Sequence, residues 1–198
     1  IHVGALVTLV AAVHYFYMRE FWVQMHRSPV VYRYIDWSIT VPLQMVEFSL
    51  VLDGVGKASG ARPPKNMFWR LLLGTVFMLS CGYAGETYAA PALPAFCCGM
   101  LGWFYILFEV HRGEAAAHRD SYASTNEAVV LAFDNMKFIV TVGWAIYPLG
   151  YFFGFLQGQV SDTDLNLIYN LADFVNKVHH FERTQYGFLT RTHIFCNK

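Results

Sequence analysis

Charged residues are scarce in this sequence. Asp, Glu, Lys and Arg make up 14% of its 198 residues, and hydrophobic residues make up 56%. A soluble domain carries about 25% charged residues. The formal net charge is +0 and no basic tract occurs, which argues against a nucleic-acid partner. The deficit of charge favours a membrane protein over a soluble one.

Cysteine is also scarce, and no secretory signal peptide is visible. Three of the 4 cysteines, Cys81, Cys97 and Cys98, lie in apolar segments, and the fourth is Cys196. Neighbours such as Cys97 and Cys98 rarely bridge each other, so we expect small core or lipid-facing residues rather than a disulfide framework or a metal site. The chain opens with Ile1 in the middle of an apolar run, so we expect its true start to lie upstream.

Apolar runs of membrane-spanning length recur along the chain. A spanning helix needs about 20 mostly apolar residues, because only a helix satisfies its own backbone polar groups in hydrocarbon. Buried helices of a soluble protein are the alternative, but so many runs with so few interior charges fit a soluble core poorly. We therefore predict an all-α membrane protein with six spans, near residues 3–22, 31–52, 68–88, 92–111, 132–156 and 163–180.

Positive charge is distributed unevenly over the polar connectors between these runs. The connectors Asp53–Asn66 and Arg112–Asn126 carry Lys and Arg, whereas 86–91 and 157–162 carry neither. By the positive-inside rule, the side of the first two connectors is cytoplasmic. This assignment alternates correctly along a multi-pass chain.

The second apolar run contains three ionisable residues, which are costly in a membrane and point to function. They are Arg33, Asp36 and Glu47. On a helix, Asp36, Thr40 and Glu47 share one face, and Glu47 lies about 16 Å along the axis from Asp36. Two carboxylates in line, one in each half of the membrane, predict a proton relay. Arg33 lies one turn outward of Asp36 and can hold negative charge near it.

The last run contains Asp173 and Lys177, which lie four residues apart and therefore face the same way. Burial in an apolar helix penalises a charged lysine. Lys177 is thus suited either to an ion pair with Asp173 or to a Schiff base with an aldehyde. Taken alone, these two residues fit a buried salt bridge between helices at least as well as a cofactor site.

The fifth run is densely aromatic. Trp144 and Tyr147 lie three residues apart on one helix face, and Pro148 is expected to kink the helix. Trp37 follows Asp36 directly. Such rings usually only pack in membrane helices, but around a lysine–aldehyde adduct they would form a flat slot for a polyene.

Four stretches of the chain resemble microbial rhodopsins, and the resemblance to the proteorhodopsin family is close. RYIDWSITVP is similar to the third helix of that family, GWAIYPLGY to the sixth and NLIYNLADFVNK to the seventh, and HYFYMR at 14–19 is similar to the end of the second. The resemblance covers about residues 1–177. It implies a seven-helix rhodopsin bundle of which about six helices are present, in one transmembrane domain over 1–180.

The resemblance also implies roles for individual residues. Lys177 would carry all-trans retinal as a protonated Schiff base, Asp36 would be the proton acceptor, Asp173 a second counterion and Glu47 the cytoplasmic proton donor. Thr40 completes the triplet with Asp36 and Glu47 that marks outward proton pumps. His14 matches a histidine that bonds to the acceptor aspartate and tunes its pKa. Tyr15 and Tyr169 are expected to bond to Asp173. The matched residues of the retinal pocket are Trp37, Trp144, Tyr147 and Pro148. Gln44 matches a colour-tuning position at which Gln accompanies blue absorption.

The function implied is a light-driven outward proton pump rather than an enzyme, in a bacterial plasma membrane. The protein would transport protons across a lipid bilayer. It would also form a homo-oligomer, either a pentamer or a hexamer. The alternatives are a sensory photoreceptor, which Glu47 disfavours, and a non-functional partial gene product. The charged stretch 181–198 departs from the family, so we expect an atypical tail that comes from a partial or frame-shifted gene or from an assembly artefact. A helix that ends early, with the tail at the inner membrane surface, is the other interpretation.

Overall fold

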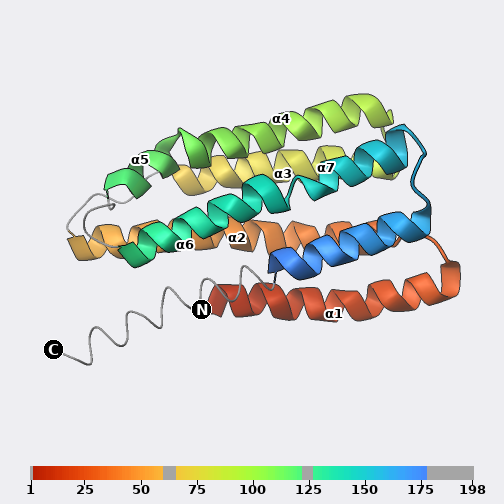
Figure 1. The fold of residues 1–198 in the computed structure, drawn as a ribbon, viewed down its shortest axis with the longest axis horizontal. Helices are drawn as coiled ribbons and strands as arrows, with labels where there is room; N and C mark the ends of the chain where they lie inside the picture. Colours follow the sequence, from red (N-terminus) through yellow and green to blue (C-terminus); the bar gives the residue numbers. More distant parts are fainter. Residues whose placement is uncertain (1, 60–65, 122–126, 178–198) are drawn as a thin grey trace.

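The computed structural model describes residues 2–59, 66–121 and 127–177. In these residues six long helical stretches run side by side as a bundle, without a strand (Figure 1). The predicted all-α class is confirmed. The predicted tail over 181–198 and the end of the last predicted span lie outside the described residues. The six stretches are α1 (His2–Met25), α2 (Val30–Ser59), α3 (Met67–Glu86), α4 (Ala92–His111), a segmented helix over 127–156 and a last helix over 162–177.

Four stretches within the described residues are long and apolar enough to cross a membrane, namely Val30–Asp53, Met67–Glu86, Ala92–Ser121 and Val129–Leu156. We predicted spans at α1 and at the last helix as well, and neither meets the same criteria. The described part of the last helix is shorter than the roughly 20 residues that a span needs. Helix α1 carries His14, Arg19 and Glu20 among its apolar residues.

Two predicted connectors contain more helix than expected. Helix α2 extends to Ser59, past the predicted end at 52, because the segment up to there contains no proline after Pro42. The connector over 112–126 contains a short helix, α5 (Glu114–Ser121). Glu114 lies in its first turn, and His118 and Arg119 lie in its last turn, where each charge favours the helix dipole.

The segmented helix over 127–156 consists of α6 (Glu127–Phe138), the π-helical η1 (Ile139–Gly143), α7 (Ile146–Tyr151) and the π-helical η2 (Phe152–Leu156). The backbone N–H of Trp144 donates to the carbonyl oxygen of Ile139 at 2.9 Å, five residues back. Pro148 lies just beyond, and it has no N–H to donate. The expected interruption near Pro148 is present, and the π-helical segments extend it over two further turns.

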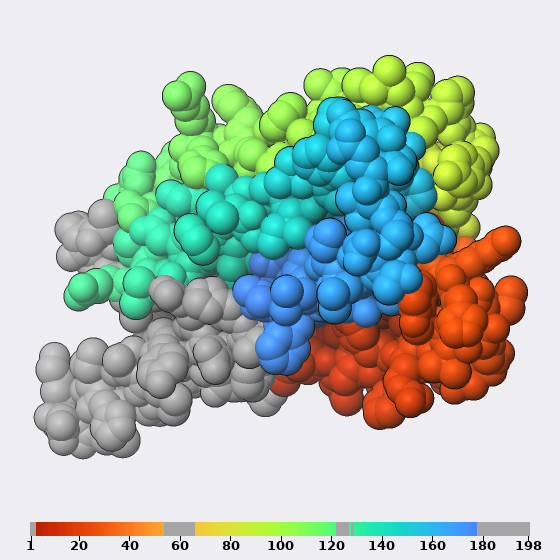
Figure 2. Space-filling model, turned by 45° about the vertical axis from the view of Figure 1, so that its right-hand side comes forward, coloured from red at the N-terminus to blue at the C-terminus, as the bar shows by residue number. Residues whose placement is uncertain are grey.

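The last helix fills the gap between α1 and the segmented helix, as both views of the molecule show (Figures 1 and 2). Large apolar side chains face outward on the bundle: Phe16 is 75% exposed and Leu73 67%. Charged side chains such as Asp36 and Asp173 are buried instead. Since a soluble protein shows the opposite distribution, this one suits a bundle with lipid outside and polar groups inside.

Two buried clusters divide the interior along the bundle. The inner cluster lies toward the 53–66 and 112–126 connectors and includes Met45, Phe48, Leu52, Phe133 and Met136. The outer cluster lies toward the opposite end and comprises Tyr34, Trp37, Leu165 and Tyr169. The outer cluster thus consists mainly of aromatic residues with polar hydroxyl or indole groups. The inner cluster consists mostly of aliphatic residues, methionines and phenylalanines.

Candidate functional site

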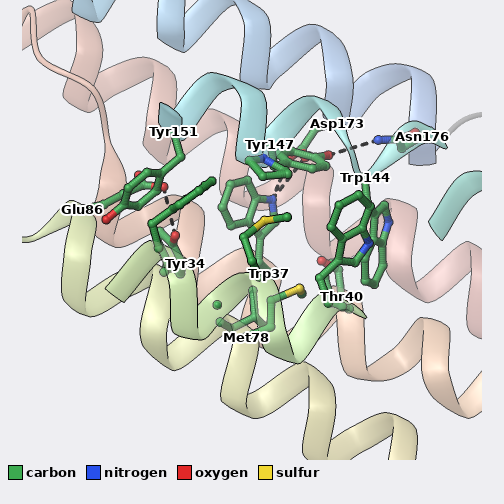
Figure 3. A pocket seen from close by; sticks show the side chains of 18 of the residues that line it. Tyr34, Trp37, Thr40, Met78, Glu86, Trp144, Tyr147, Tyr151, Asp173 and Asn176 are labelled. Atoms are coloured by element: carbon green, nitrogen blue, oxygen red, sulfur yellow. Dashed lines mark hydrogen bonds between the residues drawn. The ribbon is translucent and has the colours of Figure 1, made fainter. Parts of the chain in front are cut away.

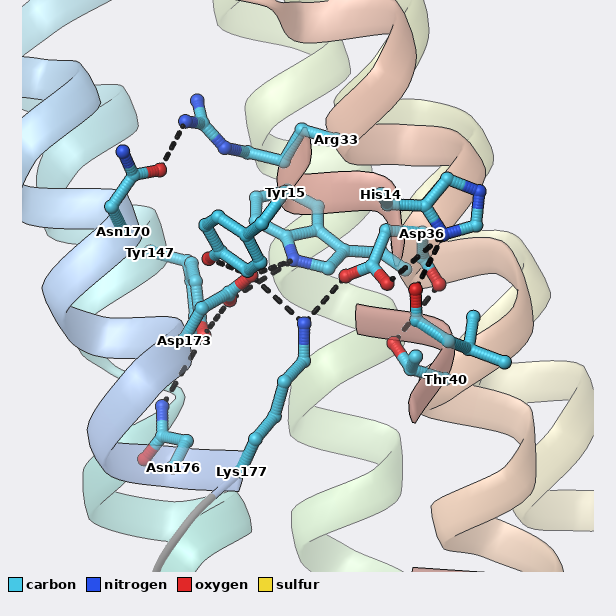
Figure 4. A network of polar contacts seen from close by, with 12 residues as sticks. His14, Tyr15, Arg33, Asp36, Thr40, Tyr147, Asn170, Asp173, Asn176 and Lys177 are labelled. Carbon is cyan, nitrogen blue, oxygen red and sulfur yellow. Dashed lines mark hydrogen bonds and ion pairs between the residues drawn. The ribbon is translucent and has the colours of Figure 1, made fainter. Parts of the chain in front are cut away.

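Lys177 lies between two buried carboxylates. Its Nζ is 2.5 Å from Asp36 Oδ2 on α2 and 2.9 Å from Asp173 Oδ2, one turn earlier on its own helix (Figure 4). Lys177 is 7% exposed, Asp36 0% and Asp173 1%. The three residues that the sequence singled out on two different helices therefore meet at one point. Removing one partner of such a buried pair typically costs about 3–5 kcal/mol, because the other charge is left uncompensated.

Asp173 is the more heavily hydrogen-bonded of the two carboxylates. Its Oδ2 accepts from the hydroxyl of Tyr15 at 2.7 Å and from Lys177. Its Oδ1 accepts from Tyr147 at 2.5 Å and from the indole N–H of Trp37 at 3.1 Å. Hydrogen bonds to a charged group each contribute about 1.5–3 kcal/mol. Asp173 therefore accepts from four donors, one on its own helix and three on other helical stretches. Together they stabilise Asp173 as an anion.

Asp36 has fewer partners among the described residues. Beyond Lys177, the Nδ1 of His14 lies 3.5 Å from Asp36 Oδ1, and it also lies 3.0 Å from the carbonyl oxygen of Val10. Thr40 donates to the backbone carbonyl oxygen of Asp36 at 2.9 Å and not to its carboxylate. His14 and Thr40 thus flank Asp36, as their positions predicted, but within residues 2–59, 66–121 and 127–177 only Lys177 makes a short bond to its carboxylate.

One predicted contact is wrong, and the side chain of Arg33 reaches another helix. Arg33 lies one turn from Asp36, and its guanidinium donates to Asn166 at 2.8 Å and to Asn170 at 3.1 Å on the last helix. Tyr169 was expected to bond to Asp173, but its hydroxyl donates to the backbone carbonyl oxygen of Tyr147 at 3.3 Å. In both cases the side chain is long enough to carry its polar end past the neighbouring turn.

A cavity between α2, α3, α4 and α7 includes Lys177 in its wall (Figure 3). Most predicted pocket residues line it, whereas Tyr15 and Tyr169 do not. Trp37 and Tyr147 meet edge to face, with ring centroids 5.0 Å apart. The predicted residues in the wall are Lys177, Trp37, Gln44, Trp144, Tyr147, Pro148, Thr40 and Asp173.

Several wall residues were not predicted. Asn176 donates to the carbonyl oxygen of Gly143 at 3.1 Å, which ties the last helix to η1. At the other end of the cavity, the buried Glu86 accepts from the Tyr34 hydroxyl at 3.0 Å (Figure 3). Glu86 ends a long apolar run, and an acid in that place was a signal that sequence reasoning passed over. Asn176 carries no such signal, because an amide next to Lys177 looks like any helix residue.

Glu47 lies apart from the cavity, further along α2. It is 3% exposed, and its neighbours Met45 and Phe48 belong to the inner cluster. Gln44, one turn before it on the same face, lies in the cavity wall. The structure therefore places the buried Glu47 one helical turn beyond the cavity wall, toward the 53–66 connector.

Comparison with known proteins agrees with this arrangement. Residues 1–190 match the family model described as "Bacteriorhodopsin-like protein". The chain is 47% identical over 178 residues to the blue-light absorbing proteorhodopsin of Gamma-proteobacterium Hot 75m4, covering 89% of this chain and 68% of that protein. It is 45% identical over 177 residues to the green-light absorbing proteorhodopsin of Gamma-proteobacterium EBAC31A08, with the same coverage.

Solved structures show the same relationship. The crystal structure of the blue light-absorbing proteorhodopsin from Med12 superposes with a TM-score of 0.79 at 37% identity, covering 96% of this chain and 82% of that one. Exiguobacterium sibiricum rhodopsin superposes with a TM-score of 0.81 at 29% identity, covering 98% and 83%. The chain belongs to the bacteriorhodopsin-like family, which implies a retinal chromophore and a light-driven transporter rather than a conventional enzyme. The predicted resemblance to proteorhodopsins is confirmed.

Proposed function

We propose that this chain is a retinal-binding, light-driven outward proton pump in which Lys177 holds the chromophore, Asp36 accepts the proton and Glu47 replaces it. The observation that carries the proposal is the buried ion pair of Lys177 with Asp36 at the wall of an aromatic cavity. A salt bridge with only a structural role would not need an aromatic-walled cavity beside the lysine.

The cavity fits retinal in its chemistry. Ligand sites in proteins usually have apolar walls and a few placed polar groups. Here the walls include Trp37, Trp144, Tyr147 and Met78, and the amine of Lys177 lies at one side. We infer covalent attachment through Lys177 Nζ. Retinal bound there would supply absorption of visible light and a light-driven change of shape.

The two carboxylates, Asp36 and Asp173, then have different roles. A proton on Lys177 Nζ lies 2.5 Å from Asp36 Oδ2, within direct transfer distance. Asp173 is close as well, but Tyr15, Trp37 and Tyr147 stabilise its anion. We therefore infer that Asp36 receives the proton, while Asp173 stays ionised and keeps Lys177 in place.

Glu47 is the inferred source of the replacement proton. Glu47 is 3% exposed, and it lies on α2 three residues from Gln44 in the cavity wall. Its position on the cytoplasmic side of the cavity would let it return a proton to Lys177 from that side only. Uptake from the cytoplasm and release at the outer end follow from the opposite placement of Glu47 and Asp36 on α2.

Colour, membrane and assembly complete the proposal. Gln44 lines the cavity, and a polar group on the lysine side would stabilise positive charge there, so we expect blue absorption. We place the protein in a bacterial plasma membrane, with the 53–66 and 112–126 connectors in the cytoplasm. We also expect a pentamer or hexamer.

An absorption spectrum of membranes that contain this chain, before and after adding all-trans retinal, tests the proposal. We expect a blue to blue-green band and, on illumination, acidification of the medium outside intact cells. Lys177→Ala should abolish both. Lys137→Ala is the matched control, because Lys137 pairs with Asp134 outside the cavity, and it should keep both.

Other outcomes would assign a different function. A visible band without acidification and with a slow photocycle would favour a sensory photoreceptor. No band with either the wild-type chain or the control would contradict retinal binding by this chain and favour a non-functional gene product.

A further inference from the structure

One end of the cavity carries a buried acid in a mostly apolar wall. Glu86, the last residue of α3, lines the cavity and is 5% exposed. Figure 3 shows it beside Tyr34 and Tyr151 at one end of the cavity, whereas Asn176 lies at the other end. Asn176 directly precedes Lys177 in the chain. Glu86 and the lysine inferred to hold retinal therefore belong to different ends of the cavity wall.

The two carboxyl oxygens of Glu86 differ in their hydrogen bonds. Oε1 accepts from the Tyr34 hydroxyl at 3.0 Å. Oε2 is buried, and no residue that the structure describes bonds to it. Burying a polar atom without a hydrogen bond is unfavourable, so such an atom in a native structure needs an explanation. At the wall of a ligand cavity, a polar group on the ligand provides one, because a few placed polar groups orient and select ligands in apolar sites.

The neighbouring tyrosines cannot satisfy this oxygen. Gly82 lies one turn before Glu86 on α3, and a Cβ built there would lie 2.6 Å from the Tyr34 hydroxyl oxygen. The glycine thus leaves room for Tyr34 to reach Glu86 from α2, where its hydrogen is used on Oε1. Tyr151 donates its hydrogen to the carbonyl oxygen of Ala92 at 3.0 Å. Both hydroxyl hydrogens are therefore used elsewhere than on Oε2.

We propose that the cavity binds a retinal whose ring carries a hydroxyl group in preference to all-trans retinal, and that this hydroxyl bonds to Glu86 Oε2. The proposal rests on the proposed function, because it needs the aldehyde end attached to Lys177. The ring lies at the opposite end of the polyene from the aldehyde, so attachment at Lys177 directs the ring away from it. A hydroxyl group can donate and accept, so it fits Glu86 in either protonation state. An unsubstituted hydrocarbon ring would leave Oε2 unpaired.

A competition between two aldehydes tests the proposal. The full chain in membranes receives equal amounts of all-trans retinal and all-trans 3-hydroxyretinal, each in excess over the chain. Borohydride then reduces the Schiff base to a stable amine, and mass spectrometry of the Lys177 peptide measures the two adducts, which differ by one oxygen atom. We expect the hydroxylated adduct to exceed the other by about tenfold, since a site that bonds to a ligand hydroxyl discriminates against the analogue without it.

Variants assign the preference to Glu86. Glu86→Leu removes both oxygens and should bring the ratio of the adducts close to one. Glu86→Gln should keep most of the preference, because an amide can still bond to a hydroxyl. Glu20→Leu is the control and should keep the full ratio, because Glu20 is exposed on α1 and bonds to Gln24.

Two results separate this proposal from the proposed function. Equal amounts of the two adducts on the wild-type chain, or a preference that survives in Glu86→Leu, would overturn the proposal and leave retinal binding by Lys177 intact. No adduct with either aldehyde would overturn both.

Discussion

The outer and inner halves of the bundle interior differ in how they treat charge. In the outer half, Asp173 accepts hydrogen bonds from Tyr15, Trp37, Tyr147 and Lys177, and Arg33 bonds to two asparagines and a serine. In the inner half, Glu47 is 3% exposed on α2 beside the inner cluster, and the buried Glu109 pairs with a single cation, Arg70, at 3.4 Å.

Under the proposed function, this difference would favour one-way transport. A network of donors stabilises ions in the outer half, so a proton released there would find polar groups that can carry it outward. The larger apolar cluster of the inner half disfavours ions, so under the proposed function a proton would cross it through a carboxyl group such as Glu47. Variants that make the two halves more alike should therefore reduce transport.

The largest effect should come from Asp36→Asn, which removes the inferred acceptor from the outer half. We expect light-driven acidification to fall by about 100-fold or more, because a positioned proton acceptor typically contributes at least that much to rate. The visible band should remain, shifted in wavelength. Asp134→Asn, on the inner end of α6 and paired with Arg119 and Lys137, is the control and should pump normally. Normal pumping by Asp36→Asn would remove Asp36 from the mechanism.

Glu47→Gln removes the carboxyl group of the inner half without changing its size. After a flash of light, we expect proton release to keep its rate and proton uptake to slow by about 100-fold. A pH-indicator dye in the medium follows both steps. An unchanged rate of proton uptake would mean that a group other than Glu47 carries protons through the inner half. That result would contradict the role inferred for Glu47.

Tyr147→Phe weakens the outer network by one hydrogen bond to Asp173. We expect a loss of about 1.5–3 kcal/mol in the free energy of unfolding, since the lost bond is to a charged group. Thermal denaturation in detergent, followed through the visible band, measures this loss. Tyr17→Phe on the exposed face of α1 is the matched control. Equal stability of the two variants would show that the Tyr147 bond is unimportant.

The smallest effect should come from Gln44→Leu, which replaces a polar wall residue with an apolar one of similar size. We expect the absorption maximum to move to longer wavelengths while acidification under saturating light stays the same. A shift to shorter wavelengths, or none, would contradict the assignment of Gln44 as the residue that sets colour.

The sequence predicted the fold well, because membrane spans depend on long apolar runs that are directly visible. It also singled out Asp36 and Lys177, since an ionisable residue in such a run needs a reason, and the structure brings the two together in the interior. Spacing placed Asp173 and Lys177 on one face correctly. The π-helical segments η1 and η2 escaped prediction, because a π turn uses the same apolar residues as an α turn.

Contacts between helices were the hardest to predict. Arg33 is one turn from Asp36 on α2, but its guanidinium reaches the asparagines of the last helix instead. Tyr169 is one turn from Asp173, but its ring carries the hydroxyl across to the backbone of Tyr147. Spacing along one helix gives the direction of a side chain but not the distance that a long one reaches.

Under the proposed function, Asp36 accepts the proton while Asp173 stays ionised. Light-minus-dark infrared difference spectroscopy tests this assignment most directly. A carboxyl group that gains a proton shows a new carbonyl band. We expect this band in the wild-type protein and in Asp173→Asn, and we expect it to be absent from Asp36→Asn. A band that persists in Asp36→Asn and disappears in Asp173→Asn would contradict the account, because the heavily hydrogen-bonded carboxylate would then be the one that accepts the proton.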